Sequence, residues 1–303
     1  MTAAGLAAVR EIAGDIKLSH SVFALPFALL GAFLALPAGR IDWGRMAVAA
    51  ALVVACMVAA RTAAMVANRL LDREIDARNP RTAGRALPAG RLRPRQAVAA
   101  LALSGAAFVG LSALFLVLQS NPWPLLLAVP VLAWICAYGL LKRFTMMCHV
   151  WLGASLAMSP VAAALAVRPE SLGAPVPWLL AAAVMLWVAG FDVLYAMQDV
   201  EVDVRDGLHS MPSRLGRDGA AWASRAMHAA CIGLLAAFWR SEPALGPWFG
   251  AAVAVAGAVV AMEHVVLAVQ GPAGFARHFT LLNGFVSLLL GGVGVAALVS
   301  SHG

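Results

Sequence analysis

Charged residues are scarce in this 303-residue chain: they make up 12% of it, against 62% hydrophobic residues. About a quarter of a typical soluble domain is charged, so this composition excludes that class. The apolar runs also lack period-two alternation and are rich in Ala and Leu, which argues against strands. Nothing resembling CxxC spacing links the four cysteines, and we interpret them as small apolar core residues: Cys56, Cys136, Cys148 and Cys231.

Most of the sequence consists of long apolar runs. Each is long enough to cross a bilayer as a helix. Nine such runs occur, at roughly 18–37, 46–68, 96–119, 123–141, 147–167, 177–198, 220–239, 247–270 and 279–300. The sequence therefore predicts an all-α membrane protein, with residues 1–303 forming a single integral-membrane domain of nine transmembrane helices around a central cavity.

The net charge of +7 does not indicate a nucleic-acid partner, because the basic residues are distributed unevenly between the connections. Seventeen of the 22 Lys and Arg residues fall in the N-terminal segment or in connections on the same side of the predicted membrane. The positive-inside rule places that side, and the N-terminus, in the cytoplasm. Nine spans place the C-terminus opposite. The lipid bilayer is the expected surrounding, and no obligate protein partner is inferred.

Three oxygen-bearing side chains recur at helical spacing where the second apolar run ends. Asn68, Asp72 and Asp76 stand at i, i+4 and i+8, so on a helix they share one face. Keeping an amide and two carboxylates together beside a membrane helix is costly without a cation. The stripe therefore indicates a cation site.

A second acidic set follows the sixth apolar run. Asp192, Tyr195, Asp199 and Asp203 occur there at i, i+3, i+7 and i+11, four spans later in the same orientation. We interpret the two sets as halves of a parallel internal repeat that face each other across the cavity. Mg²⁺ prefers a few carboxylates plus substrate phosphate, so the five predicted ligands indicate a Mg²⁺–diphosphate site: Asn68, Asp72, Asp76, Asp199 and Asp203.

Basic residues next to these sets are candidates for binding the diphosphate. Lys142 and Arg143 begin the turn after the fourth run, and Tyr138 stands four residues before Lys142 on the same helical face. For Arg143 the alternative is simple anchoring at the membrane surface. Arg78, Arg81 and Arg85 lie in a connection rich in turn formers, which we expect to close over the diphosphate as a lid.

Arg61 is a charge within a span and needs a reason to be there. It precedes Asn68 by seven residues on the same helical face, two turns deeper. It either neutralises a carboxylate on the substrate or pairs with Asp192. Asp192 and Tyr195 are candidates to orient or deprotonate a phenolic acceptor. Glu263 and His264, in the eighth run, are left as structural residues.

Two other classes of membrane protein use similar residues. An ion-coupled transporter also uses intramembrane Asp and Arg, but its binding groups would cluster near the bilayer midplane rather than at one surface. A CDP-alcohol phosphotransferase also uses aspartates and Mg²⁺, but its single compact signature is missing from this sequence.

The two acidic segments resemble the signatures of a known family. Asn68-Arg-Leu-Leu-Asp72-Arg-Glu-Ile-Asp76, followed by Asn-Pro-Arg-Thr-Ala-Gly-Arg, is similar to the first signature of the UbiA superfamily of intramembrane aromatic prenyltransferases. Tyr195-Ala-Met-Gln-Asp199-Val-Glu-Val-Asp203 resembles the second, and Tyr138-Gly-Leu-Leu-Lys142-Arg143 also agrees. The run after Asp76 looks most like the branch acting on 4-hydroxybenzoate. Residues 19–26 and 207–210 look closer to a subgroup that prenylates 1,4-dihydroxy-6-naphthoate in menaquinone synthesis through futalosine.

The resemblance implies Mg²⁺-dependent transfer of a polyprenyl group from polyprenyl diphosphate to a ring carbon of a hydroxyaromatic acid, in ubiquinone or menaquinone biosynthesis. It implies that the five ligands bind two Mg²⁺ ions holding the diphosphate, with Lys142 beside it. We expect a bacterial-type inner membrane location, an active site facing the cytoplasm, and a lateral gap between helices for the isoprenoid tail.

Overall fold

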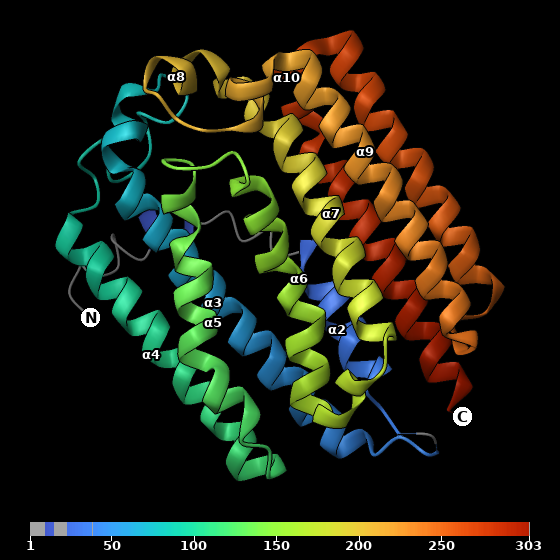
Figure 1. The fold of residues 1–303 in the computed structure, drawn as a ribbon. Helices are drawn as coiled ribbons and strands as arrows, with labels where there is room; N and C mark the ends of the chain where they lie inside the picture. Colours follow the sequence, from blue (N-terminus) through green and yellow to red (C-terminus); the bar gives the residue numbers. More distant parts are fainter. Residues whose placement is uncertain (1–9, 15–22, 38, 303) are drawn as a thin grey trace.

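The computed structural model describes residues 10–14, 23–37 and 39–302 of the chain, and within these ranges it contains helices and no strand. Figure 1 shows the long helices side by side, with short connections at both ends. The elements from residue 23 onward are α2 (Leu25–Leu34), α3 (Trp43–Arg78), α4 (Pro94–Gln119), α5 (Trp123–Leu141), α6 (Cys148–Val167), η2 (Pro169–Gly173), α7 (Val176–Ala196), η3 (Met197–Asp199), α8 (Val200–Arg205), α9 (Met211–Ser241), η4 (Pro243–Leu245) and α10 (Gly246–Ser301).

Seven of these helical segments are long and apolar enough to cross a membrane. One of them, α10, is two helical runs that meet at Gly271, where φ is 69° and Pro272 follows. These two runs correspond to the predicted spans 247–270 and 279–300. The predicted span 18–37 begins in residues outside the described ranges, and its described part holds the short apolar helix α2. The total of nine spans and the side of the N-terminus remain predictions.

Helix boundaries follow signals in the sequence. Pro lies in the first turn of α4, α5, α7 and α9, where its missing N–H costs no helical hydrogen bond. At the N-terminus of α3 the side chain of Asp42 accepts a hydrogen bond from the backbone N–H of Arg45. At the N-terminus of α9 Ser210 and Ser213 form a reciprocal capping box.

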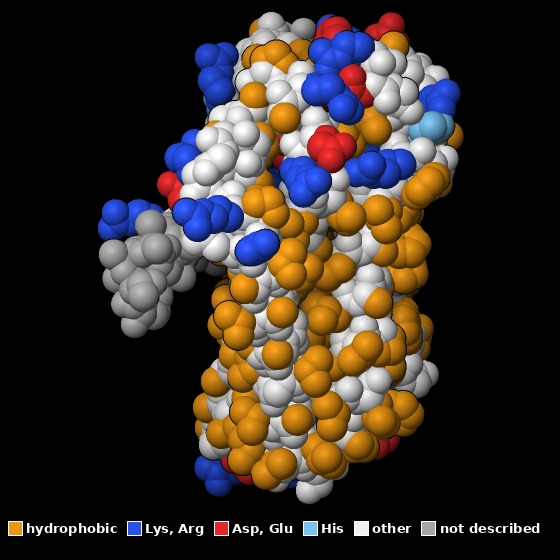
Figure 2. Space-filling view, turned by 90° about the vertical axis from the view of Figure 1, so that its left-hand side faces the viewer, with side chains coloured by type: hydrophobic (Ala, Val, Ile, Leu, Met, Phe, Trp, Pro, Cys, Tyr) orange, Lys and Arg blue, Asp and Glu red, His pale blue; other side chains and the backbone are white. Residues whose placement is uncertain are grey.

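The helices form two groups with α2 and α6 between them (Figure 1). Helices α3, α4 and α5 contact one another, and α7 packs on both α6 and α9. Helix α2 contacts α6 and α10, so it joins the groups. In Figure 2 one face of the molecule shows a tall hydrophobic belt, with Lys and Arg gathered above it and a few charges at the lower end. This distribution is the one expected of a protein embedded in a bilayer.

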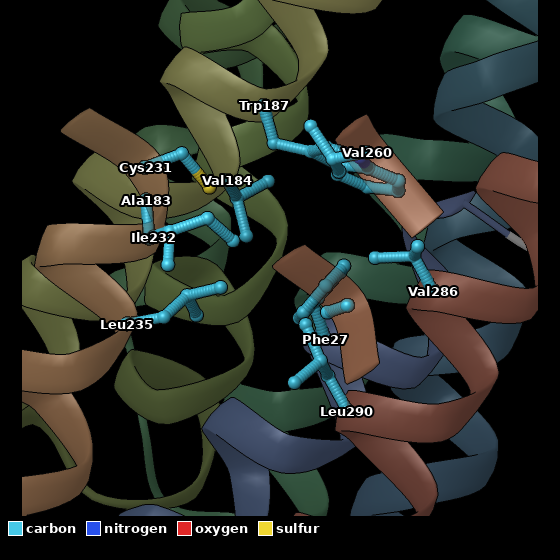
Figure 3. Close-up of a pocket in the computed structure, with 11 residues that line it drawn as sticks. Phe27, Ala183, Val184, Trp187, Cys231, Ile232, Leu235, Val260, Val286 and Leu290 are labelled. Carbon is cyan, nitrogen blue, oxygen red and sulfur yellow. The ribbon is translucent and has the colours of Figure 1, made fainter. Parts of the chain in front are cut away.

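The well-filled core lies in the C-terminal half. Trp187 of α7 makes edge-to-face contacts with Phe23, Phe27 and Phe191, with ring centroids 5.1–6.5 Å apart. Beside it, among α2, α7, α9 and α10, there is an apolar void of only about 10 Å³ (Figure 3). Its lining offers no polar partner to a water molecule, so it is a dry packing defect.

Helix α6 approaches α7 so closely that only glycine fits at Gly153. A Cβ atom there would lie 2.2 Å from the carbonyl oxygen of Met185, which is backbone and cannot turn away. This contact fixes the position of α6 against α7, and each of these helices carries one residue of the His149–Asp192 hydrogen bond described below.

Candidate active site

The first acidic stripe has the geometry that its spacing predicts. Helix α3 continues past the apolar run to Arg78, so Asn68, Asp72 and Asp76 lie on one unbroken helix. Nδ2 of Asn68 donates a hydrogen bond to Oδ2 of Asp72 at 3.3 Å. Both aspartates are buried. Two buried carboxylates one turn apart repel each other, which makes a nearby positive charge necessary.

The second acidic set does not lie on one continuous helix, contrary to the expected i, i+3, i+7 alignment. Helix α7 ends at Ala196, Asp199 ends the 3₁₀ turn η3, and Asp203 lies in the separate short helix α8. Only Asp192 and Tyr195 share α7. Asp203 nevertheless lies near Asp199, and its side chain interacts with Ser210 in the connection that leads into α9.

The two acidic segments meet in space. Asn79, which caps α3, donates from Nδ2 to Oδ1 of Asp199 at 2.8 Å. One residue earlier, Nε of Arg78 donates to Oδ2 of Asp206 at 3.1 Å. Arg205 in turn donates to the carbonyl oxygen of Arg78. The ends of α3 and α8 are therefore joined by three contacts between residues more than 100 positions apart in the chain.

Each of three buried or half-buried aspartates has its own cation. Lys142 Nζ lies 2.6 Å from Asp72 Oδ2, and Nη1 of Arg85 lies 2.8 Å from both oxygens of Asp76. Arg81 donates from Nε to Oδ1 of Asp199 at 2.8 Å and from Nη2 to Oδ2. Arg81 and Arg85 belong to the connection after α3, which accordingly lies over the carboxylates as the predicted lid would.

Ion pairing shifts the pKa values of two residues that lie outside the membrane-spanning helices, Arg81 and Asp206. Burial alone would lower the pKa of Arg81, but the hydrogen bond and charge of Asp199 outweigh it, and the pKa is raised. The hydrogen bond from Arg205, supported by the one from Arg78, lowers the pKa of Asp206. Both shifts favour the charged form of the residue concerned, Arg81 in one case and Asp206 in the other.

Arg143 and Arg78 occupy different places from Lys142. Nη2 of Arg143 donates to the carbonyl oxygen of Leu71 at 2.6 Å. The same atom lies 3.9 Å from Asp72 Oδ1, too far for a hydrogen bond. Arg143 and Arg78 both line an open groove of about 390 Å³ on the outer side of α3 and α5. The structure thus brings Lys142 into the carboxylate cluster and leaves these two arginines at its edge.

Asp192 has a partner that sequence reasoning missed. Oδ2 of Asp192 lies 2.7 Å from Nδ1 of His149, the second residue of α6. Nε2 of the same imidazole accepts a hydrogen bond from the backbone N–H of Met211 at 3.2 Å. No spacing signal links residues 149 and 192, since their proximity arises only from the packing of α6 on α7.

The chain contains two tyrosines, and both lie beside the acidic cluster. The ring of Tyr195 stands between the guanidinium of Arg81, 5.7 Å from its centroid, and the ring of Phe279, at 4.8 Å. Tyr138 is close enough to Asp72 and Asp192 to interact electrostatically with both carboxylates.

A cavity of about 330 Å³ begins at this cluster and runs down between α2, α3, α4, α5 and α6. Asn68 and Tyr138 line its polar end, and Arg61 lines it two turns deeper. Most of the remaining lining is Ala, Val, Leu and Met. Along α3 the lining extends from Asn68 to Val53, which is about 22 Å at 1.5 Å per residue. This is most of the roughly 30 Å hydrocarbon thickness of a bilayer.

The donor set fits a hard divalent cation. All five predicted ligands offer side-chain oxygens, and Oδ1 of Asp72 is buried without a hydrogen-bond donor. Within the described ranges no three acidic, histidine or cysteine side chains converge as they would around a metal ion. The aspartates are turned to Lys142, Arg81 and Arg85 instead, so cation binding requires these pairs to open.

Two polar contacts concern Glu263 and His264, which the sequence left without partners. Asn283 donates from Nδ2 to Oε1 of Glu263 at 2.6 Å, and Nε2 of His264 lies 3.0 Å from Nδ1 of His228. Both pairs join helical segments within the C-terminal half, away from the cavity, which agrees with a structural role.

Comparison with known proteins gives this geometry a family. The sequence model of the UbiA prenyltransferase family matches residues 24–289. The chain belongs to this family. It is 32% identical over 239 residues to a 4-hydroxybenzoate octaprenyltransferase of Saccharophagus degradans, covering 77% of this chain and 75% of that protein. Alignments with several further relatives of that name extend over about half of their length.

Solved structures of UbiA homologues share the fold. An apo structure from Aeropyrum pernix K1 superposes with a TM-score of 0.79 at 34% identity, covering 91% of this chain and 97% of that one. A homologue from Archaeoglobus fulgidus bound to DMAPP and Mg²⁺ gives 0.65 at 16% identity, covering 96% and 99%. Membership of this family confirms the prediction from the sequence that the protein is a helical membrane prenyltransferase.

Proposed function

We propose that this UbiA-family protein transfers a polyprenyl group from polyprenyl diphosphate to the ring carbon ortho to the hydroxyl of a 4-hydroxybenzoate-type acid. The observation that carries the proposal is the meeting of the two acidic segments over the polar end of a long apolar cavity. An anionic head bound at the cluster leaves an apolar tail to run down the cavity. The names of the relatives support the choice of acid. With 1,4-dihydroxy-6-naphthoate the same chemistry would serve menaquinone synthesis.

Asn68, Asp72, Asp76, Asp199 and Asp203 would hold Mg²⁺. When bound, the metal supplies positive charge that stabilises the departing diphosphate. Lys142 lies among these ligands and would donate a hydrogen bond to a bound diphosphate. Arg81 and Arg85, which pair with Asp199 and Asp76, would likewise be available to phosphate oxygens. Arg143 and Arg78, at the edge of the cluster, contribute charge from outside.

The reaction begins as the diphosphate leaves with the electron pair of the allylic C–O bond. The ring carbon ortho to the acceptor hydroxyl attacks the allylic cation, while Asp192 accepts the hydroxyl proton and Tyr195 helps orient the ring. The remaining ring proton moves to the phenolic oxygen, which restores aromaticity and leaves one proton on Asp192. Arg61 binds the acceptor's carboxylate. The apolar cavity lining excludes water that would otherwise quench the cation.

Membrane orientation is part of the proposal. We place the protein in a bacterial-type inner membrane, with the acidic cluster at the cytoplasmic face. Both substrates would then enter from the cytoplasmic side. Alkaline phosphatase fused after residue 303 is active only outside the cytoplasm, so an active fusion supports nine spans and an inactive one refutes them.

The decisive experiment incubates the purified protein in liposomes with Mg²⁺, polyprenyl diphosphates of several lengths and each of the two acids. Mass spectrometry then identifies the prenylated products. Product from 4-hydroxybenzoate supports the proposal, product only from the naphthoate reassigns the acceptor, and absence of both refutes the reaction.

A further inference from the structure

His149 lies at the junction of three helices and is almost completely buried, with 3% of its surface exposed. It belongs to α6, its Nδ1 contacts Asp192 of α7, and its Nε2 contacts the first residue of α9. The imidazole thus uses both nitrogens, one toward a charged side chain and one toward a helix N-terminus.

The contact with Met211 determines where the proton of the imidazole resides. A backbone N–H only donates, so Nε2 must present its lone pair and carry no proton. Met211 opens the first turn of α9, which Gly216 interrupts with a non-helical conformation, so it is this hydrogen bond rather than a long helix dipole that keeps the proton off Nε2. A neutral imidazole then carries its hydrogen on Nδ1 and donates it to Asp192 Oδ2.

The direction of this hydrogen bond matters for Asp192. With Oδ2 held by His149, the carboxylate plane is fixed and Oδ1 remains for a second hydrogen bond. Asp192 retains 19% of its side-chain surface exposed, against 4% for His149, so one edge of the carboxylate is accessible. Tyr138, which lines the polar end of the cavity, lies near enough to feel its charge. Asp192 is therefore near Tyr138, which lines the cavity, although Asp192 itself is not one of the lining residues.

His149 also holds the connection that follows the second acidic set and leads into α9. Next to it, Sγ of Cys148 contacts the carbonyl oxygen of His209 at 3.6 Å, and the N–H of His209 donates to the carbonyl oxygen of Lys142 at 2.6 Å. Ser210, the N-cap of α9, interacts with Asp203. The imidazole therefore ties Asp192 to the same segment that positions Asp203 and Lys142.

We propose that neutral His149, protonated on Nδ1 and anchored by the N-terminus of α9, is the positioning residue that fixes Asp192 for proton acceptance. This inference rests on the proposed function for the role of Asp192, while the hydrogen-bonding state of His149 stands apart from it. Without His149 the Asp192 carboxylate loses the hydrogen bond that orients it.

Two substitutions separate the contacts of the imidazole. In His149→Asn the side-chain amide places a donor where Nδ1 stands but does not reach Met211. In His149→Gln the amide oxygen reaches the position of Nε2 but offers nothing at Nδ1. We expect His149→Asn to keep kcat within about threefold of wild type, and His149→Gln to lower it at least roughly tenfold, as losses of orienting hydrogen bonds typically do. The KM for the diphosphate should change little in either variant.

The reverse order, with Gln active and Asn inactive, would assign His149 to capping α9 and overturn the proposal. Equal activity of both variants, or loss in both while their melting temperatures match wild type, would overturn it as well. A substitution that unfolds the protein is recognised by its melting temperature in detergent.

A second measurement needs no substrate. The chain has seven histidines, and ¹⁵N NMR of labelled protein, compared with the His149→Asn spectrum, identifies the His149 signals. A protonated Nδ1 with an unprotonated Nε2 supports the proposal. The opposite tautomer or an imidazolium overturns it. If wild-type protein prenylates neither acid, the proposed function fails while this spectrum still decides the state of His149.

Discussion

Lys142 and Asp72 form an ion pair with 2.6 Å between Nζ and Oδ2, although 70 residues separate them in the chain. The carboxylate is buried and its other oxygen has no hydrogen-bond donor. Asp72 is therefore placed to exchange one cation for another, and it is the residue on which the proposed chemistry depends most directly.

Replacing Asp72 by Asn removes a negative charge from the proposed metal site while preserving its shape. Since groups that stabilise charge in the transition state typically contribute about 10²–10³ in kcat, we expect a loss of at least roughly a hundredfold in prenyl transfer. Glu74→Gln is the matched control, because Glu74 is exposed, pairs with the exposed Arg73 and should leave the rate near wild type. Near-normal turnover of Asp72→Asn would remove this aspartate from the metal site.

Chelation by EDTA should abolish transfer, and excess Mg²⁺ should restore it, because five oxygen ligands suit this cation and the diphosphate needs its charge neutralised. The measurement is the product yield in liposomes before and after adding metal. Melting temperatures with and without EDTA provide the control that the protein stays folded. Undiminished transfer in EDTA would contradict a metal-dependent reaction.

Arg61→Ala should impair binding of the aromatic acid rather than of the diphosphate, because Arg61 lines the cavity two turns below Asn68. A hydrogen bond to a charged group is worth about 1.5–3 kcal/mol, so the KM for the acid should rise roughly 10- to 100-fold. Steady-state kinetics with each substrate varied in turn provides the test. Arg73→Ala, an exposed arginine farther along α3, serves as the control. An effect confined to the KM of the diphosphate would move Arg61 into the phosphate site.

Ala128→Phe should shorten the space available to the isoprenoid tail. Ala128 is 1% exposed and lines the cavity toward the end opposite the acidic cluster, whereas its neighbour Val129 is 63% exposed on the outer surface. Competition between short and long polyprenyl diphosphates should show a loss of long-chain product in Ala128→Phe and no change in Val129→Phe. Unaltered chain-length preference in both variants would mean that the tail does not follow this cavity.

Gly153→Ala should destabilise the protein, because the added Cβ would meet the Met185 carbonyl at 2.2 Å. Overpacking of this kind costs about 1–3 kcal/mol, which a thermal melt in detergent detects as a lower Tm. Gly110→Ala, on α4 with open space around the position, should leave the Tm unchanged or slightly higher. Equal melting temperatures for the two variants would show that α6 and α7 can separate without cost.

The first acidic stripe was predictable because Asn68, Asp72 and Asp76 lie on one regular helix, where spacing alone decides which residues share a face. The second was only partly predictable. The sequence from Tyr195 to Asp199 contains no Gly or Pro, so nothing local marks the end of α7 at Ala196. The same periodicity argument therefore holds for α3 and fails for the segment after Tyr195.

Contacts between distant segments are the other feature that the sequence predicted only in part. That the ends of α3 and α8 meet followed from the repeat of acidic motifs, whereas the position of His149 beside Asp192 followed from no motif. Lys142 and Arg143 are adjacent in sequence, yet only Lys142 reaches the cluster closely, because successive residues at a helix end point in different directions. Separating two such neighbours required the side-chain geometry.

The contrast between a filled C-terminal half and a hollow N-terminal half has a consequence for sequence variation. Random substitutions around Trp187 act on a densely packed apolar core, so they should lower the amount of protein that accumulates in cells. Substitutions along the open lumen between α3 and α6 meet empty space, so they should leave abundance intact and alter which molecules are accepted. A library sorted separately by expression and by product would divide along this boundary, and evolutionary change in substrate preference would be concentrated in the first half of the chain.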